Sequence, residues 1–147
     1  MAKHPDRDGP AEAVVEELLQ VTGQLLRRLR AESNPSGLTW SQAVVLARLG
    51  RNGAMTTADL ARAEAVKPQS MGVTLAGLER DGLVERRPHP TDGRQFLFAL
   101  TAKGAEIRRR RRLLKREWLS GAMARLDPED RRTLAAALAV IRRLGET

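Results

Sequence analysis

Apolar residues recur every three or four positions through most of this chain, and that spacing predicts a mainly helical protein. A long amphipathic helix is predicted over residues 11–31. Two more are predicted near the C-terminus, over residues 101–126 and from residue 127 onward. Three shorter helices are predicted between these long elements, over residues 39–50, 56–63 and 68–81.

The residues at the ends of the shorter segments favour helix termini. Thr39 and Gln42 have the spacing of a capping box, and Thr56 or Thr57 is placed to cap the next helix. Pro68 suits the first position of its helix, because its missing N–H needs no partner there. The buried stripe of that helix is expected to be Met71, Leu75 and Leu78.

Only residues 83–100 depart clearly from helical spacing. In the second half of this segment Phe96, Phe98 and Leu100 alternate, and we expect them to point toward the core. Gln95 and Ala99 are then expected to point away. The tip between the two predicted strands carries the residues least suited to regular pairing, Pro88, Pro90 and Gly93.

A helix pair followed by a basic β-hairpin defines the expected fold class. The second helix of such a pair, here residues 68–81, can enter a DNA major groove. A basic ribbon beside it can reach phosphates or the minor groove. We therefore predict a mainly α protein with a small β-hairpin wing (α+β), a winged helix-turn-helix that binds double-stranded DNA.

Composition agrees with this interpretation and excludes several others. Lys and Arg number 26 against 18 Asp and Glu in 147 residues, and the net charge of +8 favours a polyanionic partner. The absence of cysteine excludes disulfides and thiolate metal sites. Residues 1–10 lack a signal-peptide core, and no apolar run is long enough to span a bilayer. We expect a cytoplasmic protein with no membrane partner.

Catalysis is not expected. The only histidines, His4 and His89, fall in the N-terminal tail and at the hairpin tip, and there is no glycine-rich phosphate loop or metal-ligand spacing. We predict no catalytic residues, no metal and no cofactor.

The amphipathic helices at both ends of the chain carry more apolar surface than a small wing domain can bury. We therefore predict that they form the interface of a homodimer. The expected organisation is a flexible tail (1–10), an N-terminal dimerisation helix (11–37), a DNA-binding domain (38–101) and C-terminal dimerisation helices (102–147).

Two short motifs resemble the MarR family of winged-helix transcriptional regulators. Residues 81–86 (DGLVER) resemble that family's exit from the recognition helix into the wing, and Asp92-Gly93-Arg94, followed by Leu100-Thr101, resembles its wing motif. The resemblance covers residues 11–145 by the order and length of elements. It implies a homodimer, a pseudo-palindromic operator, usually repression, and often relief by a small aromatic or phenolic effector.

One departure from the family pattern lies in the middle of the predicted recognition helix. Members of the family commonly carry Thr-Arg where this chain has Gly72 and Val73. An arginine that reads guanine is therefore absent. A glycine inside a helix also weakens it by roughly 1 kcal/mol relative to alanine. Either Gly72 permits close approach of the backbone to DNA, or the loss is tolerated.

The candidate base-reading residues follow from the exposed face of the same helix. Gln69 can pair with adenine, Ser70 with several base edges, and Val73 can contact a thymine methyl. Thr74 is a candidate for a base or a phosphate. An ordinary solvated helix face is the alternative. The candidate phosphate contacts nearby are Lys67 and Thr57.

The hairpin supplies the other candidate contacts, Arg86, Arg87, His89 and Arg94. Arginine in a narrow minor groove reads groove shape. Asp92 would repel phosphate, so we expect it to pair with a wing arginine such as Arg94 and to fix the tip. The alternative is that these charges only keep an exposed hairpin soluble.

Three features leave alternatives open. The run at residues 108–112 is all arginine and is expected to be a solvated helix face with buried stems. Trp40 and Trp118 either border a ligand cavity or belong to the core or the interface. The whole chain is either a specific regulator, a non-specific architectural DNA-binding protein, or a protein-interaction module on the same scaffold.

Overall fold

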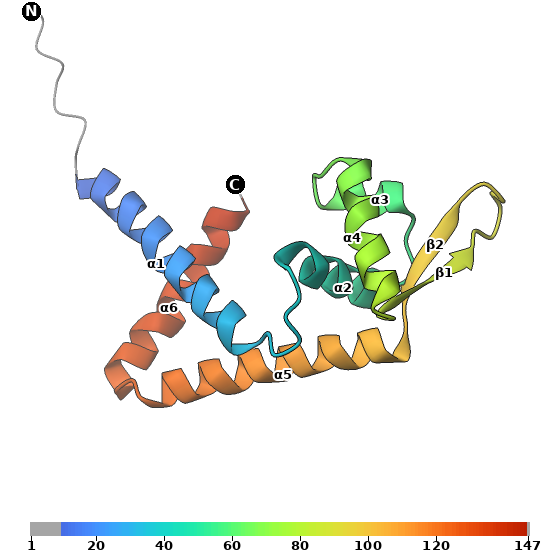
Figure 1. The fold of residues 1–147 in the computed structure, drawn as a ribbon. Coiled ribbons are helices and arrows are strands. Elements are labelled where there is room, and N and C mark those ends of the chain that lie inside the picture. The colour runs from blue at the N-terminus through green and yellow to red at the C-terminus, as the bar shows by residue number, and fades with distance from the viewer. Residues whose placement is uncertain (1–9, 147) are drawn as a thin grey trace, which may run out of the picture. The chain divides into compact units, whose positions relative to one another are not determined.

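The computed structural model describes residues 10–146 (Figure 1). The tail predicted for residues 1–10 lies outside this range except for Pro10, which begins the first helix. The chain divides into two compact units. One unit is formed by residues 34–113, and the other by the two ends of the chain, up to Ser33 and from Leu114 onward.

Every predicted element is present among the described residues, in the predicted order and of the predicted type, with ends that shift by a few residues at most. The mainly α fold with a two-stranded antiparallel wing is therefore confirmed. The elements are α1 Pro10–Glu32, α2 Trp40–Asn52, α3 Thr57–Ala63, α4 Pro68–Arg80, β1 Val84–Pro88, β2 Phe96–Leu100, α5 Ala102–Ala124 and α6 Pro128–Gly145.

Side-chain caps begin the helices where the sequence predicts them. The Thr39 hydroxyl accepts the backbone N–H of Gln42 (3.2 Å), and the Gln42 side chain accepts that of Thr39 (3.0 Å), which completes the capping box. Of the two candidates at α3, Thr56 is the cap, and its hydroxyl accepts the N–H of Asp59 at 3.1 Å. These bonds satisfy donors that the first helical turn leaves unpaired.

The core of the 34–113 unit lies where α2, α3 and α4 meet the base of the wing. Its central side chains, Leu46, Leu60, Leu75 and Leu78, are at most 1% exposed. Burial of a leucine contributes about 1.5–3 kcal/mol, so this cluster accounts for much of the unit's stability. The predicted stripe of α4 is confirmed, since Met71 is also buried.

The wing differs from the prediction at three residues. Pro88 is paired with Phe96 as the last residue of β1, so the unpaired tip is shorter than predicted. Phe96 is 50% exposed instead of buried, and Ala99 is buried instead of exposed. Met55 forms a bridge with Phe98 on the free edge of β2, which covers the strand there but not at Phe96.

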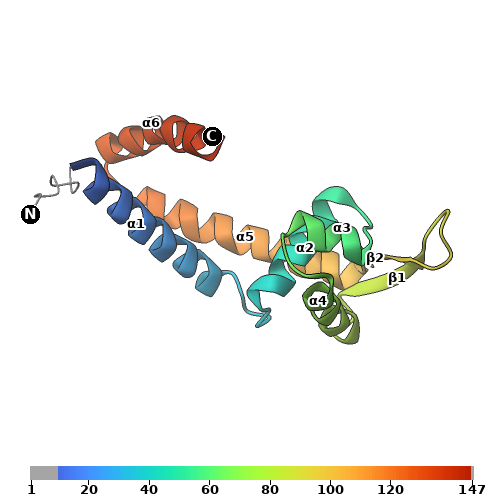
Figure 2. The ribbon, with the colours of Figure 1, turned by 90° about the horizontal axis from the view of Figure 1, so that it is seen from above.

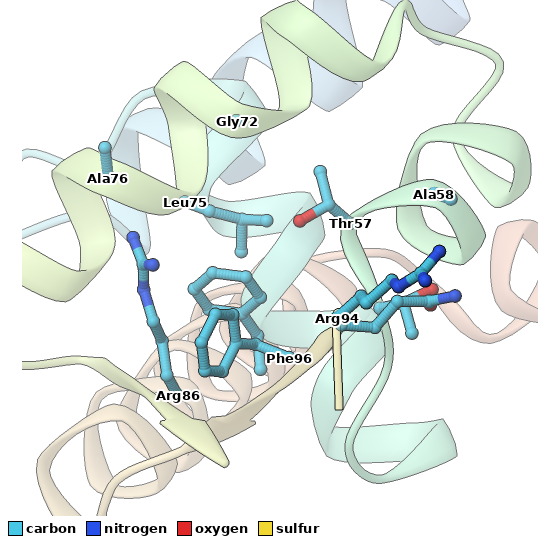
Figure 3. Close-up of a pocket in the computed structure, with 11 residues that line it drawn as sticks. Thr57, Ala58, Gly72, Leu75, Ala76, Arg86, Arg94 and Phe96 are labelled. Atoms are coloured by element: carbon cyan, nitrogen blue, oxygen red, sulfur yellow. The ribbon is translucent and has the colours of Figure 1, made fainter. Parts of the chain in front are cut away.

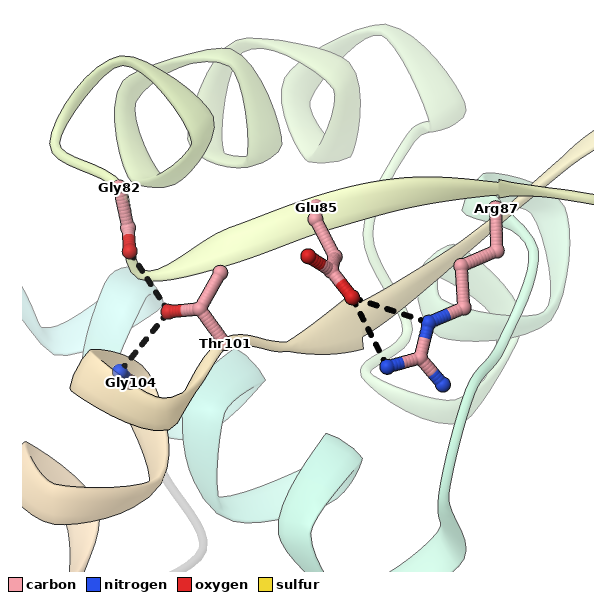
Figure 4. A network of polar contacts seen from close by, with 5 residues as sticks. All are labelled: Gly82, Glu85, Arg87, Thr101 and Gly104. Atoms are coloured by element: carbon pink, nitrogen blue, oxygen red, sulfur yellow. Dashed lines mark hydrogen bonds and ion pairs between the residues drawn. The ribbon is translucent and has the colours of Figure 1, made fainter.

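A tight junction joins the end of α4, the wing and the start of α5 (Figure 4). Gly82 turns the chain with φ at +71°, a conformation that favours glycine. The Thr101 hydroxyl donates to the Gly82 carbonyl (2.6 Å) and accepts the Gly104 N–H (3.1 Å). A Cβ on Gly104 would overlap the Leu83 carbonyl, lying 2.9 Å from its carbon atom, so the backbones touch here.

The arginine run in α5 is not uniformly solvated as predicted. Arg111 is only 7% exposed and donates a hydrogen bond to the Asn34 side-chain oxygen. Burial lowers the pKa of Arg111 below its ordinary value. Arg108 is half-buried and lies against Gly50. The stems of two arginines thus pack inside the unit, and the three others in the run are exposed.

The unit formed by the chain ends consists of α1, α6 and the C-terminal part of α5 (Figure 2). No described residue of α6 is buried, although that helix carries an apolar stripe. The same is true of much of α1. Large apolar side chains that remain exposed here are Val14, Val15, Leu18, Leu19, Val21, Leu25, Leu26, Leu119, Leu134, Leu138, Val140, Ile141 and Leu144.

Candidate nucleic-acid interface

The outward face of α4 is uncharged along most of its length. At about 100° per residue, Gln69, Val73 and Ala76 lie opposite the buried stripe, and all three are exposed. Val73 is 72% exposed, which is unusual for a large apolar side chain. No charged residue occurs from Pro68 to Leu78. This face can offer an amide and methyl groups to a partner.

The two hydroxyl residues of α4 lie on its flank. The Thr74 hydroxyl donates to the Ser70 backbone carbonyl at 3.3 Å, so its proton is engaged within the helix. Both residues line a cavity of about 210 Å³ together with Trp40, which is 53% exposed. Lys67 precedes α4, is exposed, and makes no capping bond through its side chain.

The three arginines of the wing have different surroundings. Arg86 forms an ion pair with Glu79 (2.9 Å), and its guanidinium carbon lies 5.6 Å from the centroid of each of two phenylalanine rings. Arg87 forms an ion pair with Glu85 (2.8 Å) within β1 (Figure 4). Arg94 is exposed, and no carboxylate lies within salt-bridge distance of it in residues 10–146. Arg94 is thus the wing arginine most available to an anion.

The predicted pairing of Asp92 with an arginine side chain is wrong, but its position fixes the tip in another way. One carboxylate oxygen of Asp92 accepts the backbone N–H of Arg94 (3.0 Å). The other accepts the side-chain amide of Gln95 (3.0 Å). Asp92 therefore orders the turn that carries Arg94 through a backbone bond, as aspartate commonly does in turns.

His89 is also engaged inside the tip. Its Nδ1 accepts the backbone N–H groups of Asp92 (3.0 Å) and Thr91 (3.3 Å). His89 is half-buried, so its role in the structure is to shape the turn.

A second cavity, of about 410 Å³, lies between α3, α4 and the wing (Figure 3). Thr57 is half-buried at its edge. Phe96, Ala76 and Ala58 also line it, and their positions in the sequence predict no role in a site. Apolar alternation in β2 placed Phe96 in the core, and no signal in the sequence indicated that its ring is 50% exposed.

The predicted cavity between the two tryptophans stays a prediction. Trp40 lines the smaller cavity beside α4, whereas Trp118 lies in α5 and lines neither of the two cavities described. Within the described part of the chain, no group of three or more His, Cys, Asp or Glu side chains is arranged to hold a metal ion. None of the helices in that part is both long and apolar enough to cross a membrane.

The fold and this surface together define a winged helix-turn-helix protein. The model of the MarR family matches residues 38–96, which run from the loop before α2 to the start of β2. Relatives that share 34–40% identity over most of both chains carry the same kind of domain, and the chain belongs to the MarR family. The family consists of transcriptional regulators and not of enzymes.

Two relatives come from Mycobacterium tuberculosis. The "HTH-type transcriptional regulator MT0903.1" is 40% identical over 114 residues, which cover 78% of this chain and 80% of that protein. The "HTH-type transcriptional repressor Rv2887" is 34% identical, with coverage of 78% and 84%. Among solved structures, a putative transcriptional regulator from Pseudomonas aeruginosa superposes with a TM-score of 0.84 at 32% identity, with coverage of 97% and 99%.

Proposed function

We propose that this protein is a homodimeric, sequence-specific repressor that places α4 in the DNA major groove and the wing over the adjacent minor groove. The observation that carries the proposal is the combination of an exposed, uncharged α4 face with an unpaired Arg94 in the wing beside it. An exposed helix face that carries an amide and methyl groups can contact base edges, and a cation without a carboxylate partner can bind phosphates or a narrow minor groove.

The proposed contacts divide by chemistry. Gln69 reads adenine, Val73 contacts a thymine methyl, and Ser70 bonds a neighbouring base edge. Positioning contacts to the phosphates come from the remaining candidates, which are Thr57, Lys67, Thr74, Arg86, Arg87, His89 and Arg94. Arg94 is the strongest of these, because the side chains of Arg86, Arg87, His89 and Thr74 already have partners within the protein.

Dimerisation is supported by the apolar faces of α1 and α6. α6 has 18 residues, and none of its side chains is buried. An apolar stripe of this length is expected to be covered by another surface. A second copy of this chain is the partner we propose, with residues 11–37 and 102–147 as the dimerisation region and residues 38–101 as the DNA-binding domain. A two-fold dimer predicts inverted half-sites about one DNA turn apart, or ~10 bp.

Repression is supported by a relative. A relative at 34% identity is described as a repressor, and a dimer that covers an operator blocks polymerase access. We extend the proposal to release by a small aromatic or phenolic effector, for which the cavity beside Trp40 offers an aromatic wall next to α4. A bound ring there would lie close to the DNA-reading helix.

Selection of bound duplexes from a random DNA pool, at near-physiological salt, tests the proposal. An inverted repeat whose half-sites lie one turn apart is expected. The affinity for the selected duplex should exceed the affinity for competitor DNA by a factor of ~10³ or more. Binding without a recovered motif would favour an architectural DNA-binding protein instead, and the absence of salt-dependent binding would favour a protein-interaction module.

Arg94→Ala is expected to weaken binding to all DNA sequences by about tenfold and to reduce the slope of log K against log salt concentration by about one. The reason is that Arg94 contributes a counterion-releasing contact and reads no base. Fluorescence anisotropy over a salt series measures both quantities. Arg132→Ala in α6 removes the same charge elsewhere, on the face of that helix turned away from its apolar stripe, and is the control. Equal effects of the two variants would reject a role for Arg94 beyond net charge.

Two substitutions of Asp92 distinguish how the order of the wing tip and how its charge affect DNA affinity. Asp92→Ala and Asp92→Asn both remove one negative charge, which by itself strengthens DNA binding. Only Asn keeps an oxygen that accepts the Arg94 N–H. We therefore expect Asp92→Ala to bind DNA several-fold more weakly than Asp92→Asn in the same anisotropy assay. Equal affinities would show that the tip needs no carboxylate or amide cap.

A further inference from the structure

The cavity between α4 and the wing has an apolar wall with a basic side chain on each side of it (Figure 3). Gly72, Leu75 and the Phe96 ring give it an apolar wall. In Figure 3, Arg86 stands to one side of this wall and Arg94 to the other. An apolar stretch is therefore framed by two cations within one 410 Å³ space.

The exposed ring of Phe96 is held in place although the core does not cover it. It is 50% exposed, and the Arg86 guanidinium carbon lies 5.6 Å from its centroid. Arg86 is in turn fixed by Glu79 at 2.9 Å. A half-exposed aromatic side chain in a fixed setting is a preformed contact surface and not a loose side chain.

One sugar–phosphate strand separates each major groove of DNA from the next minor groove. With α4 in the one groove and the wing in the other, as proposed above, that strand has to cross the space between them. We propose that the cavity is the seat of this strand. A deoxyribose packs against Phe96 and Gly72, and the phosphates on its two sides face Arg86 and Arg94. The inference rests on the proposed function and assigns this cavity to a sequence-independent part of the DNA.

The seat explains Gly72. A Cβ at this position would meet nothing within 4 Å, and the backbone does not have a positive φ, so folding does not require glycine here. Glycine inside a helix weakens it. What glycine provides is open space in the cavity wall, through which a bound backbone approaches α4 closely.

The test compares the wild-type protein with Gly72→Ala and Gly72→Leu on the selected operator and on a random duplex. We expect Gly72→Leu to weaken binding to both duplexes by about tenfold or more, which leaves their ratio unchanged. The salt slope should fall as well, by up to about two, because a strand displaced from the cavity loses its phosphate contacts with Arg86 and Arg94. Gly72→Ala should raise the midpoint of thermal unfolding and weaken binding less. Gly121→Ala, another helical glycine with nothing within 4 Å, should raise the midpoint without loss of affinity.

Each other outcome has a definite meaning. Gly72→Leu that binds DNA as tightly as the wild type overturns the seat and leaves the proposed function intact. A loss confined to the operator assigns position 72 to base reading and also overturns the seat. If Gly72→Leu does not fold, Phe96→Glu replaces it, because that side chain is already half exposed. Wild-type protein that binds neither duplex overturns the proposed function itself.

Discussion

Gly104→Ala should lower the free energy of unfolding by about 2 kcal/mol, in a range of 1–3. Alanine in a helix is favoured over glycine by up to about 1 kcal/mol, so the steric penalty has to exceed that gain. It does so because the obstacle is the Leu83 backbone, whose carbonyl carbon would lie 2.9 Å from the new Cβ. Backbone at this junction cannot move aside without breaking the bonds of Thr101 to Gly82 and Gly104.

Chemical denaturation followed by circular dichroism measures this effect. Gly121→Ala is the matched control, because it lies in the same helix and a Cβ there meets nothing within 4 Å. It should increase stability by up to about 1 kcal/mol. Opposite signs for the two substitutions are therefore expected. A stabilising effect of both would show that α5 does not begin against Leu83 in solution.

The elements of the fold could be predicted because their signals are local. A capping box at Thr39, a proline at the first position of α4 and an apolar stripe at helical spacing each act within one or two turns. Two of the residues that were placed wrongly, Phe96 and Arg111, depend on how segments distant in the sequence lie against one another. Phe96 pairs with Pro88 at the tip end of the hairpin and is 50% exposed, whereas Phe98, nearer the base of the wing, is buried. Arg111 is buried against Asn34, and nothing near it in the sequence indicates that.

The candidate interface shows the same division. The outward face of α4 and the cationic wing follow from periodicity and composition, so their residues could be named in advance. The ion pair of Arg86 with Glu79 could not be predicted, because it depends on how the hairpin lies against α4. The pair of Arg87 with Glu85 is local, but it depends on the direction of two side chains within β1. Sequence thus identifies which wing residues are basic, whereas the structure shows that Arg94 has no carboxylate partner in the described part of the chain.

Leu138→Glu is the substitution from which we expect the largest loss of function. Leu134, Leu138 and Ile141 lie on one face of α6, and each is more than a third exposed. In a two-fold interface each substitution occurs twice, so two carboxylates would be buried without partners. We expect a monomer by sedimentation velocity. Affinity for the operator should fall about 10³-fold, toward that for random DNA, because one half-site is lost.

Ala136→Glu is the control for this prediction, since position 136 faces away from the stripe on the same helix and is exposed. It introduces the same charge and should leave both dimer and operator binding unchanged. If Leu138→Glu remains dimeric, the apolar stripe of α6 is not in the interface, and α1 and α5 must supply it. If it becomes monomeric yet keeps operator affinity, one DNA-binding domain suffices and the symmetric operator is rejected. If Leu138→Glu loses both the dimer and the operator affinity, DNA specificity depends on α6, although that helix is far from α4 in the sequence.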